Sequence, residues 1–339
     1  MRSPRRRVLL AHSGGTIGMR RGERGYEPAS GHLASLLAGL PEMASADLPE
    51  FELLEFEPLL DSSDMLPRDW LRLARTIEAN YAAFDGFVVL HGTDTLAYSA
   101  SALSFLLDGL GKPVILTGSQ VPLVELRSDA RENLITSLLL AARLDLHEVC
   151  VCFGGVLLRG NRSTKVSAGG FDAFSSPNEP ELARIGVDIE FRPGALRPAG
   201  SGNLVVPGLL DVTVAALRLF PGISARLLEN AMREPVSGVA LETYGAGNAP
   251  GRDPELLAAI AAATARGVVV VNITQCLRGR VDMSGYATGA ALREAGVVSG
   301  EDMTPEAALS KLIWLLGRGL EPDEVRRLIP SDLRGELTS

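Results

Sequence analysis

The chain is poor in cysteine and histidine, and each shortage excludes a class of protein. Its three cysteines are Cys150, Cys152 and Cys276. Cys150 and Cys152 alternate along one expected strand, so no disulfide framework is implied, and free buried cysteines suit a reducing cytoplasm. The four histidines and three cysteines have neither HxxxH nor CxxC spacing. We therefore expect no metal site, and nothing in the sequence calls for a cofactor.

Long apolar runs are also missing. No stretch approaches the roughly 18–20 apolar residues of a membrane-spanning helix. The arginines 5–7 lead into the apolar run 8–11, which is far shorter than the roughly 7–15 residues of a signal-peptide core. We expect no signal peptide, no membrane contact and a cytoplasmic protein. Basic residues are outnumbered, 33 against 41 acidic ones, so nucleic-acid binding is not expected either.

What is present is the composition of a globular protein, with 46% hydrophobic and 22% charged residues over 339 positions. That length predicts two domains. Strand and helix patterns alternate in the first half, which favours a largely parallel sheet covered on both faces. The expected strands are 8–11, 51–56, 86–91, 113–117 and 149–158, the last being a strand or a hairpin arm. The expected helices are 67–81, 96–107 and 130–142.

Residues 191–208 are rich in proline and glycine and are expected to form an interdomain linker. The alternation restarts after them, with strands at 236–241 and 268–273 and helices at 254–265, 304–316 and 322–329. The prediction is an α/β protein. Residues 1–190 form a larger N-terminal, doubly wound, mostly parallel sheet domain that contains the candidate functional segments, and residues 209–339 form a smaller C-terminal α/β domain.

Two segments far apart in the sequence each place a threonine just beyond an apolar strand. They are Ser13-Gly14-Gly15-Thr16 and His91-Gly92-Thr93-Asp94-Thr95. In an open α/β sheet, ligands bind outside the carboxyl ends of the strands, so both loops are expected to converge on one small polar substrate. Glycines allow a close backbone approach, and a threonine hydroxyl becomes a nucleophile when a base activates it. An enzyme with a hydroxyl nucleophile is therefore the leading interpretation.

Each segment also has another interpretation. The first could be a plain glycine-rich turn or a phosphate-binding loop, although it matches neither G-x-G-x-x-G nor G-x-x-x-x-G-K-[ST]. In the second, Thr93 or Asp94 could cap the following helix. Capping and catalysis do not exclude each other, because one residue can cap while its neighbour turns into the cleft.

Two further polar segments could complete the site. Asp61-Ser62-Ser63-Asp64 precedes a helix and could bind the amino and carboxylate groups of a substrate, or Ser63 or Asp64 could cap that helix. Lys165 stands among strand residues. If it points inward beside Thr93 and Asp94, it could accept or relay the threonine proton. If it points outward, it is an ordinary solvated lysine.

Together these segments resemble the bacterial-type L-asparaginases. The matching segments are 14–17, 61–64, 91–95, Lys165, 114–120, 127–130 with Asn133, 244–250 and 285–289. They occur in that family's order and rough spacing, and they cover nearly the whole chain. Gly118-Ser119-Gln120, the Asp-Ser-Ser-Asp segment and the expected lack of a signal peptide point to the cytoplasmic type I branch.

The resemblance implies an amidohydrolase that converts L-asparagine to L-aspartate and ammonia through a threonine nucleophile, with possible side activity on glutamine. It implies a homodimer or homotetramer. Thr16 matches the family's primary nucleophile, and Tyr26 matches the tyrosine of a mobile loop that closes over the substrate. Thr93, Asp94 and Lys165 match a second catalytic set.

The resemblance also implies which residues hold the substrate. Asp61, Ser62 and Ser63 match the segment that binds the α-amino and α-carboxylate groups. Thr93 and Asp94 belong to the same binding set, and Asp94 shares the contact with the amino group.

Some type I members have an allosteric asparagine site, and Thr274-Gln275-Cys276 resembles part of it. Glu242 stands where an arginine would be expected to hold the carboxylate of the effector. A glutamate there would repel that carboxylate. The expectation for Glu242, Thr274 and Cys276 is therefore allosteric activation that is weak or absent.

Two other functions stay open. An asparaginase-like subunit of an archaeal Glu-tRNA(Gln) amidotransferase would supply ammonia to a partner enzyme, but that family usually carries an extra N-terminal domain, and the catalytic strand here begins at Val8. A non-catalytic amino-acid sensor on the same fold is the second. The presence of Thr16, Thr93, Asp94 and Lys165 favours an enzyme. Glutamine differs from asparagine by one methylene, so the preference between them is not readable from the motifs.

Overall fold

The structure, a computed structural model, describes residues 5–23, 25–200, 203–285 and 287–338, without the side chains of residues 287 and 288. Contacts within the chain divide it into two compact units. The first comprises residues up to 176 and 180–206, and the second comprises 177–179 and the residues from 207 onward. Each unit is built around a sheet with parallel strands. This confirms the α/β class, with a larger N-terminal and a smaller C-terminal sheet.

The sheet of the first unit has the order β12-β11-β8-β7-β6-β5-β1-β4. Neighbouring strands from β4 to β7 are parallel, and β8, β11 and β12 extend the far edge in antiparallel fashion. The bounds are β1 Arg7–Gly14, β4 Glu50–Leu60, β5 Gly86–Leu90, β6 Val114–Thr117, β7 Val149–Phe153, β8 Val156–Arg159, β11 Ala183–Ile185 and β12 Ile189–Phe191. The segment expected as a strand or hairpin arm is thus the β7–β8 hairpin.

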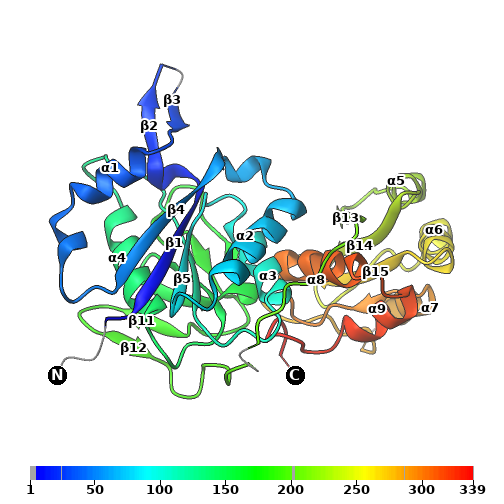
Figure 1. Cartoon of the computed structure of the whole chain (residues 1–339). Coiled ribbons are helices and arrows are strands. Elements are labelled where there is room, and N and C mark those ends of the chain that lie inside the picture. The colour runs from blue at the N-terminus through cyan, green and yellow to red at the C-terminus, as the bar shows by residue number, and fades with distance from the viewer. Residues whose placement is uncertain (1–4, 24, 201–202, 286, 339) are drawn as a thin grey trace. The chain divides into compact units, whose positions relative to one another are not determined.

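Helices cover both faces of this sheet. In Figure 1, α2 (Pro67–Asn80) and α3 (Leu96–Leu106) lie on one side, and α1 (His32–Ala38) and α4 (Ala130–Ala141) lie on the other. The central strands are buried along their whole length, which explains their apolar runs. In α2, by contrast, the buried residues follow a helical stripe, as expected of a surface helix: Trp70, Leu73, Ala74 and Ile77.

The start of α2 decides one of the alternatives left open by the sequence. Pro67 occupies the first turn, where its missing N–H is no loss. The carboxylate of Asp69 accepts a hydrogen bond of 2.9 Å from the backbone N–H of Leu66. The N-cap residue is Leu66, so neither Ser63 nor Asp64 caps this helix.

The strand order reverses at β1. The chain runs from β1 to β4 on one side and then returns to β5 on the other. In doubly wound sheets such a reversal opens a crevice at the carboxyl ends of the strands, and ligands bind there. The two threonine segments follow β1 and β5, so both reach this switch point.

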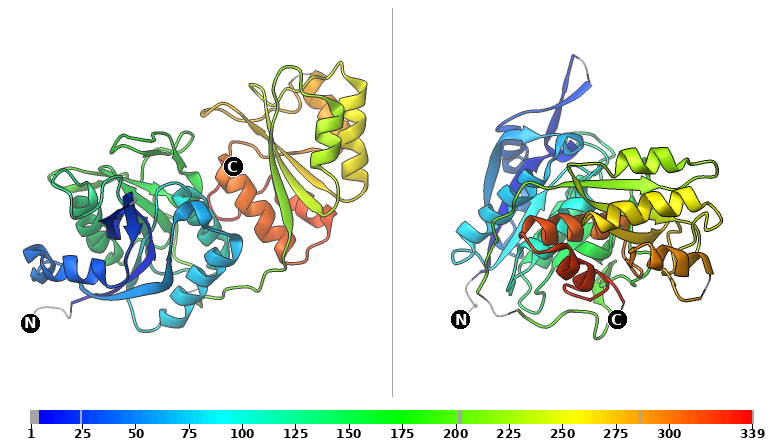
Figure 2. Two further views of the ribbon diagram at one scale, coloured as in Figure 1. Left: turned by 90° about the horizontal axis from the view of Figure 1, so that it is seen from above. Right: turned by 90° about the vertical axis from the view of Figure 1, so that its right-hand side faces the viewer.

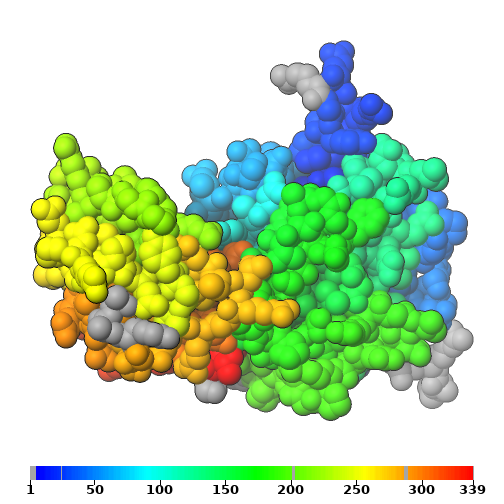
Figure 3. Space-filling view, turned by 180° about the vertical axis from the view of Figure 1, so that it is seen from behind, coloured from blue at the N-terminus to red at the C-terminus, as the bar shows by residue number. Residues whose placement is uncertain are grey.

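A β hairpin follows the first threonine segment. It consists of β2 (Met19–Gly22) and β3 (Gly25–Pro28), which pair in antiparallel fashion. It stands out from the surface of the first unit as the blue projection in Figure 3. The resemblance predicts a mobile loop at this place, and the structure has a paired β hairpin there.

The segment expected as a linker is held on the first unit up to Val206. The backbone N–H of Val206 donates to Oε1 of Glu78 over 2.8 Å, and Val205 forms a bridge with Asp108. Residues 201 and 202 of this segment lie outside the described residues.

The second unit has a four-stranded sheet of order β13-β14-β15-β16, in which every neighbouring pair is parallel. Figure 2 shows α5 and α6 on one face and α8 on the other. The bounds are β13 Thr213–Arg218, β14 Val236–Thr243, β15 Val269–Thr274, β16 Val298–Ser299, α5 Ala225–Ala231, α6 Pro254–Ala265, α7 Ala287–Glu294, α8 Pro305–Gly317 and α9 Pro322–Leu328. Among the described residues of the whole chain, no helix combines the length and apolarity needed to span a membrane.

Candidate active site

The loops that follow β1, β4 and β5 pack directly on one another. Gly15 has φ of 87°, and a Cβ placed on it would lie 2.3 Å from the backbone nitrogen of Gly92. A Cβ on Gly92 would in turn lie 2.5 Å from Oγ of Ser62. Only glycine permits these approaches. The glycines beside the two threonines therefore allow three strand ends to pack closely together.

Thr16 begins a short 3-10 helix, η1 (Thr16–Gly18), directly after β1. Its side chain is half-buried, whereas the next residue, Ile17, is fully buried and anchors the turn in the core. The carbonyl of Ile17 also accepts a 3.2 Å hydrogen bond from the N–H of Leu123 in the loop after β6. The turn that carries Thr16 is thus anchored through the next residue, Ile17, at the switch point.

Thr93, Asp94 and Lys165 form one hydrogen-bonded group. Lys165 lies on β9 (Thr164–Lys165), which pairs with β10 (Phe174–Ser175). Its Nζ donates to Oγ1 of Thr93 over 2.9 Å and to Oδ1 of Asp94 over 2.7 Å. The side chain of Lys165 is 19% exposed and that of Asp94 is 66% exposed. Lys165 is therefore not a solvated edge lysine.

The capping interpretation of Thr93 and Asp94 is wrong. Helix α3 begins at Leu96, and its N-cap residue is Thr95, which makes no side-chain capping bond. The hydroxyl of Thr95 instead donates to the carbonyl of Ser62 over 2.7 Å. This bond ties the loop after β5 to the loop after β4.

Asp61, Ser62 and Ser63 differ in their surroundings. Oδ1 of Asp61 accepts from the backbone N–H of Ser63 over 2.9 Å and from its hydroxyl over 2.8 Å, which closes a local turn. Ser62 opens the 3-10 helix η3 (Ser62–Asp64) and is buried against Gly92. The Ser62 hydroxyl thus lies at the junction of the strand ends.

Two residues in the loop after β6 bond to candidate site residues without having been assigned a role from the sequence: Gln120 bonds to the Thr93 group, and Glu125 bonds to Tyr26. Oε1 of Gln120 accepts from the hydroxyl of Thr93 over 3.2 Å. Oε1 of Glu125 accepts from the hydroxyl of Tyr26, on the β2–β3 hairpin, over 2.6 Å. Gln120 belongs to a segment that resembles the family, which was a usable signal. Nothing in the sequence points to Glu125.

His91 supports the site from beneath. It is fully buried, and that burial lowers its pKa to about 4. Its Nδ1 lies 2.7 Å from the carbonyl of Gly92, and its Nε2 lies 2.8 Å from Oγ of Ser99. A neutral imidazole held at both nitrogens fixes the Gly92 turn rather than exchanging protons with a substrate.

The residues expected at an allosteric site belong to the second unit. Glu242, on β14, forms an ion pair of 3.5 Å with Arg218. Thr274 ends the neighbouring strand β15, and its hydroxyl donates to the carbonyl of Gly245 over 2.6 Å and accepts from the N–H of Cys276 over 3.0 Å. Cys276 is exposed, whereas Cys150 and Cys152 are buried. The motif Gly285–Gly289 includes Tyr286, which lies outside the described residues.

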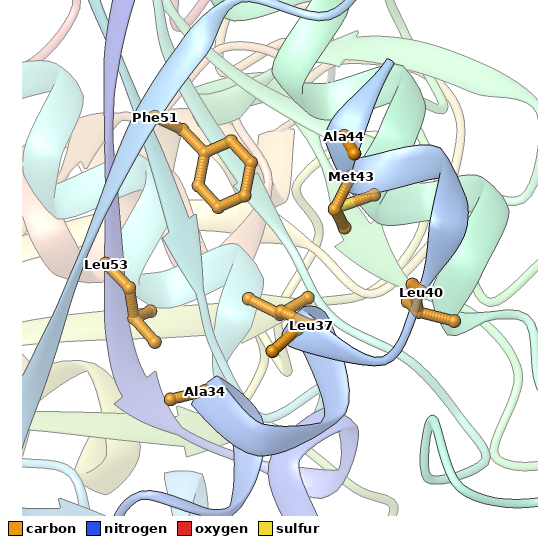
Figure 4. Close-up of a pocket in the computed structure, with 8 residues that line it drawn as sticks. Ala34, Leu37, Leu40, Met43, Ala44, Phe51 and Leu53 are labelled. Carbon is orange, nitrogen blue, oxygen red and sulfur yellow. The ribbon is translucent and has the colours of Figure 1, made fainter.

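Two other features do not belong to the polar group. An apolar pocket of about 350 Å³ lies between α1, η2 (Pro41–Ala44) and β4 (Figure 4). It is lined by Ala34, Leu37, Ala38, Leu40, Met43, Ala44, Phe51 and Leu53, which offer no side-chain charge to an amino-acid substrate. In the part of the chain that the structure describes, no cluster of three or more His, Cys, Asp or Glu residues could hold a metal ion.

Comparison with known proteins identifies relatives of the whole chain. Residues 7–197 match the family model "Asparaginase, N-terminal", and residues 213–329 match "Glutaminase/Asparaginase C-terminal domain". The chain is 50% identical to L-asparaginase 1 of Escherichia coli (strain K12), over 98% of each protein. It is 46% identical to a 60 kDa lysophospholipase of Mus musculus, over 99% of this chain and 63% of that protein.

A solved structure gives the same result in three dimensions. The crystal structure of L-asparaginase I from Vibrio cholerae O1 matches with a TM-score of 0.92 and 47% identity, over 99% of this chain and all of that one. The coverage of the match includes both units. The chain therefore belongs to the asparaginase family.

Proposed function

We propose that the protein is an L-asparaginase, which hydrolyses the side-chain amide of L-asparagine to L-aspartate and ammonia. One observation carries the proposal. Thr93 shares a hydrogen-bonded group with Lys165 and Asp94, and this group lies on the same switch point as the Thr16 turn. The relatives named L-asparaginase match this chain over nearly their whole length, which supports the choice of substrate.

In the proposed reaction, the hydroxyl oxygen of Thr16 attacks the carboxamide carbon. The C–N bond breaks, a proton passes to the nitrogen, and ammonia leaves a β-aspartyl ester on the threonine. Water then adds to the ester carbonyl and the C–O bond to Thr16 breaks, which gives aspartate and restores the hydroxyl. Gly15 and Gly92 have no side chain that could shield the neighbouring backbone N–H groups. These N–H groups therefore suit an oxyanion that develops beside the two loops.

The remaining residues divide the other tasks. Lys165, which is paired with Asp94, donates to the Thr93 hydroxyl, and this set assists the proton transfers. Asp61, Ser62 and Ser63, together with Asp94, bind the α-amino and α-carboxylate groups of asparagine. Tyr26 lies on the hairpin that closes over the substrate and excludes water.

We further propose that the protein is cytoplasmic, acts as a homodimer or homotetramer and shows no strong activation by asparagine. Light scattering of the purified protein across a concentration series tests the assembly. A monomer at all concentrations would contradict it.

The test of the function is ammonia release from L-asparagine and from L-glutamine by the wild type, Thr16→Ser and Thr16→Ala. We expect turnover of asparagine by the wild type, reduced turnover by Thr16→Ser, and a loss of several orders of magnitude in Thr16→Ala. Thr76→Ala is the matched control, because the hydroxyl of Thr76 donates to the carbonyl of Arg72 within α2 and takes no part in the candidate site. Asparagine binding without turnover by a folded wild type would instead support a sensor or a partner-dependent amidotransferase subunit.

A further inference from the structure

The hydroxyl of Thr93 has two neighbours, and they require opposite roles of it. Nζ of Lys165 lies 2.9 Å away, and Oε1 of Gln120 lies 3.2 Å away. A lysine ammonium carries donors only, so Thr93 accepts from Lys165 and its own hydrogen must go elsewhere. The amide oxygen of Gln120 is placed to take it.

The orientation of the Gln120 amide is determined by its other end. Nε2 of Gln120 donates to the carbonyl of Gly170 over 3.1 Å. A flipped amide would set its oxygen against that carbonyl, two acceptors face to face, and would leave both groups without a partner. The flipped form is therefore disfavoured, and Oε1 faces Thr93.

The backbone of Gln120 is anchored as well. Its N–H lies 3.1 and 3.0 Å from the two carboxylate oxygens of Asp129, the residue before α4. Nδ2 of Asn133 donates to the carbonyl of Gly118 over 3.1 Å and lies 3.3 Å from Oδ2 of Asp129. The amide oxygen is thus held in place by α4 and by the loop around Gly170, not by Thr93 alone.

We infer that Gln120 is a positioning residue that sets the direction of the Thr93 hydroxyl and thereby supports the charged form of Lys165. While Lys165 is an ammonium, the hydroxyl hydrogen points to Gln120, and a lone pair faces Nζ. When Lys165 loses its proton, the same hydrogen can turn to Nζ, so Gln120 and neutral Lys165 compete for it. The inference rests on the proposed function, since it concerns the same group of residues.

Replacing Gln120 should therefore change the protonation of Lys165 in an ordered way. Gln120→Met keeps the length of the side chain but removes the acceptor, so the ammonium loses support and gives up its proton at lower pH. Gln120→Glu keeps an acceptor and adds a negative charge, so the ammonium persists to higher pH. Three carboxylates have contacts with these residues or with Gly170, and both variants leave them in place: Asp94 bonds to Lys165, Asp129 bonds to the backbone of Gln120, and Asp172 lies beside Gly170.

The chain allows this to be measured without any enzymatic assay, because it contains only three lysines, Lys112, Lys165 and Lys311. Competitive acetylation across a pH series, read by peptide mass spectrometry, follows each of them separately. We expect the midpoint for Lys165 to rise in the order Gln120→Met, wild type, Gln120→Glu. Lys112 bonds to the carbonyls of Tyr81 and Phe84 and serves as the internal control, with an unchanged midpoint.

The kinetic counterpart is a fall in kcat for Gln120→Met of roughly five- to tenfold, which corresponds to one neutral hydrogen bond, with KM changed much less. One limb of the plot of kcat against pH should shift between the variants. Its midpoint should rise in the same order as the acetylation midpoint of Lys165. Equal Lys165 midpoints in the three folded proteins would overturn the inference, whatever the activity. Ordered midpoints in a protein that releases no ammonia would uphold it and reject the proposed function.

Discussion

The hydroxyl of Tyr26 donates a hydrogen bond to Oε1 of Glu125 over a distance of 2.6 Å. The bond joins the β2–β3 hairpin to the loop after β6. It is also the largest of the causes that raise the pKa of Tyr26. The same loop is tied to the Thr16 turn through the N–H of Leu123 and the carbonyl of Ile17. A loop that is tied to the turn of the proposed nucleophile therefore also supplies the carboxylate that bonds to the proposed lid residue.

We expect removal of this carboxylate to free the hairpin. The hairpin contains Arg20 and Arg21, which are sites for trypsin. Glu125→Leu should raise the rate of tryptic cleavage there by roughly fivefold, the change in open population that the loss of one ordinary hydrogen bond produces. Glu125→Gln keeps an acceptor and should be cleaved much like the wild type.

The matched control for the hairpin experiment is Leu126→Ala, because Leu126 is fully exposed in the same loop. It should leave the cleavage rate unchanged. Equal rates for Glu125→Leu and the wild type would show that the hairpin is held by other contacts.

Lys165→Met should abolish turnover while the protein stays folded. The variant removes the amine that bonds to both Thr93 and Asp94, and loss of a proton-transfer group costs about 10²–10⁴-fold in kcat. Lys165→Arg should also be nearly inactive, because a guanidinium keeps the charge but does not give up its proton. Single-turnover kinetics with asparagine would measure both, and near-normal kcat in either variant would remove Lys165 from the mechanism.

Gly15→Ala should damage stability and activity together. Its φ of 87° is strained for any other residue, and the new Cβ would lie 2.3 Å from the backbone of Gly92. We expect a loss of more than about 2 kcal/mol in the free energy of unfolding, measured with urea. Gly194→Ala separates the cost of backbone strain from the cost of the clash. Gly194 also has a positive φ, of 71°, but an added Cβ would meet nothing there, so this variant should lose only about 1 kcal/mol. Equal losses would contradict the proposed close packing of the strand ends.

His91 should make stability depend on pH. Burial lowers its pKa from 6.5 to about 4 in the folded protein. Below pH 6.5 the unfolded chain takes up a proton that the folded protein refuses until about pH 4, so stability falls as the pH drops through this window. The full effect is roughly 3 kcal/mol. Urea unfolding at a series of pH values should show a shallower fall in His91→Gln, and identical slopes would reject the assignment.

Glu242 should keep the rate curve for asparagine hyperbolic. Its carboxylate pairs with Arg218 and adds a negative charge at the end of β14. If an effector carboxylate bound beside Thr274 and Cys276, as the family resemblance implies, that charge would oppose its binding. Initial rates across a wide range of asparagine concentration test this. A sigmoidal wild-type curve that Glu242→Arg left unchanged would refute the role given to Glu242.

The alternation of apolar strands with helices predicted the α/β class, because strands buried on both faces need unbroken apolar runs such as Gly86–Leu90. The same alternation identified the strand ends at Thr16 and Thr93 as candidate site positions. Short elements escaped it, among them β9, which carries Lys165. A two-residue strand has no periodicity to read, and its position depends on the pairing with Phe174.

By itself, the sequence determined which residue types stand at the strand ends, and the physical reason is local: glycine, threonine and aspartate directly follow apolar runs. Only the tertiary structure decided how those residues meet. It placed Lys165 beside Thr93 and Asp94, turned Asp61 onto Ser63, and gave Thr93 and Tyr26 their partners Gln120 and Glu125. Such contacts join residues many positions apart, so they depend on strand order and packing, which no local pattern encodes.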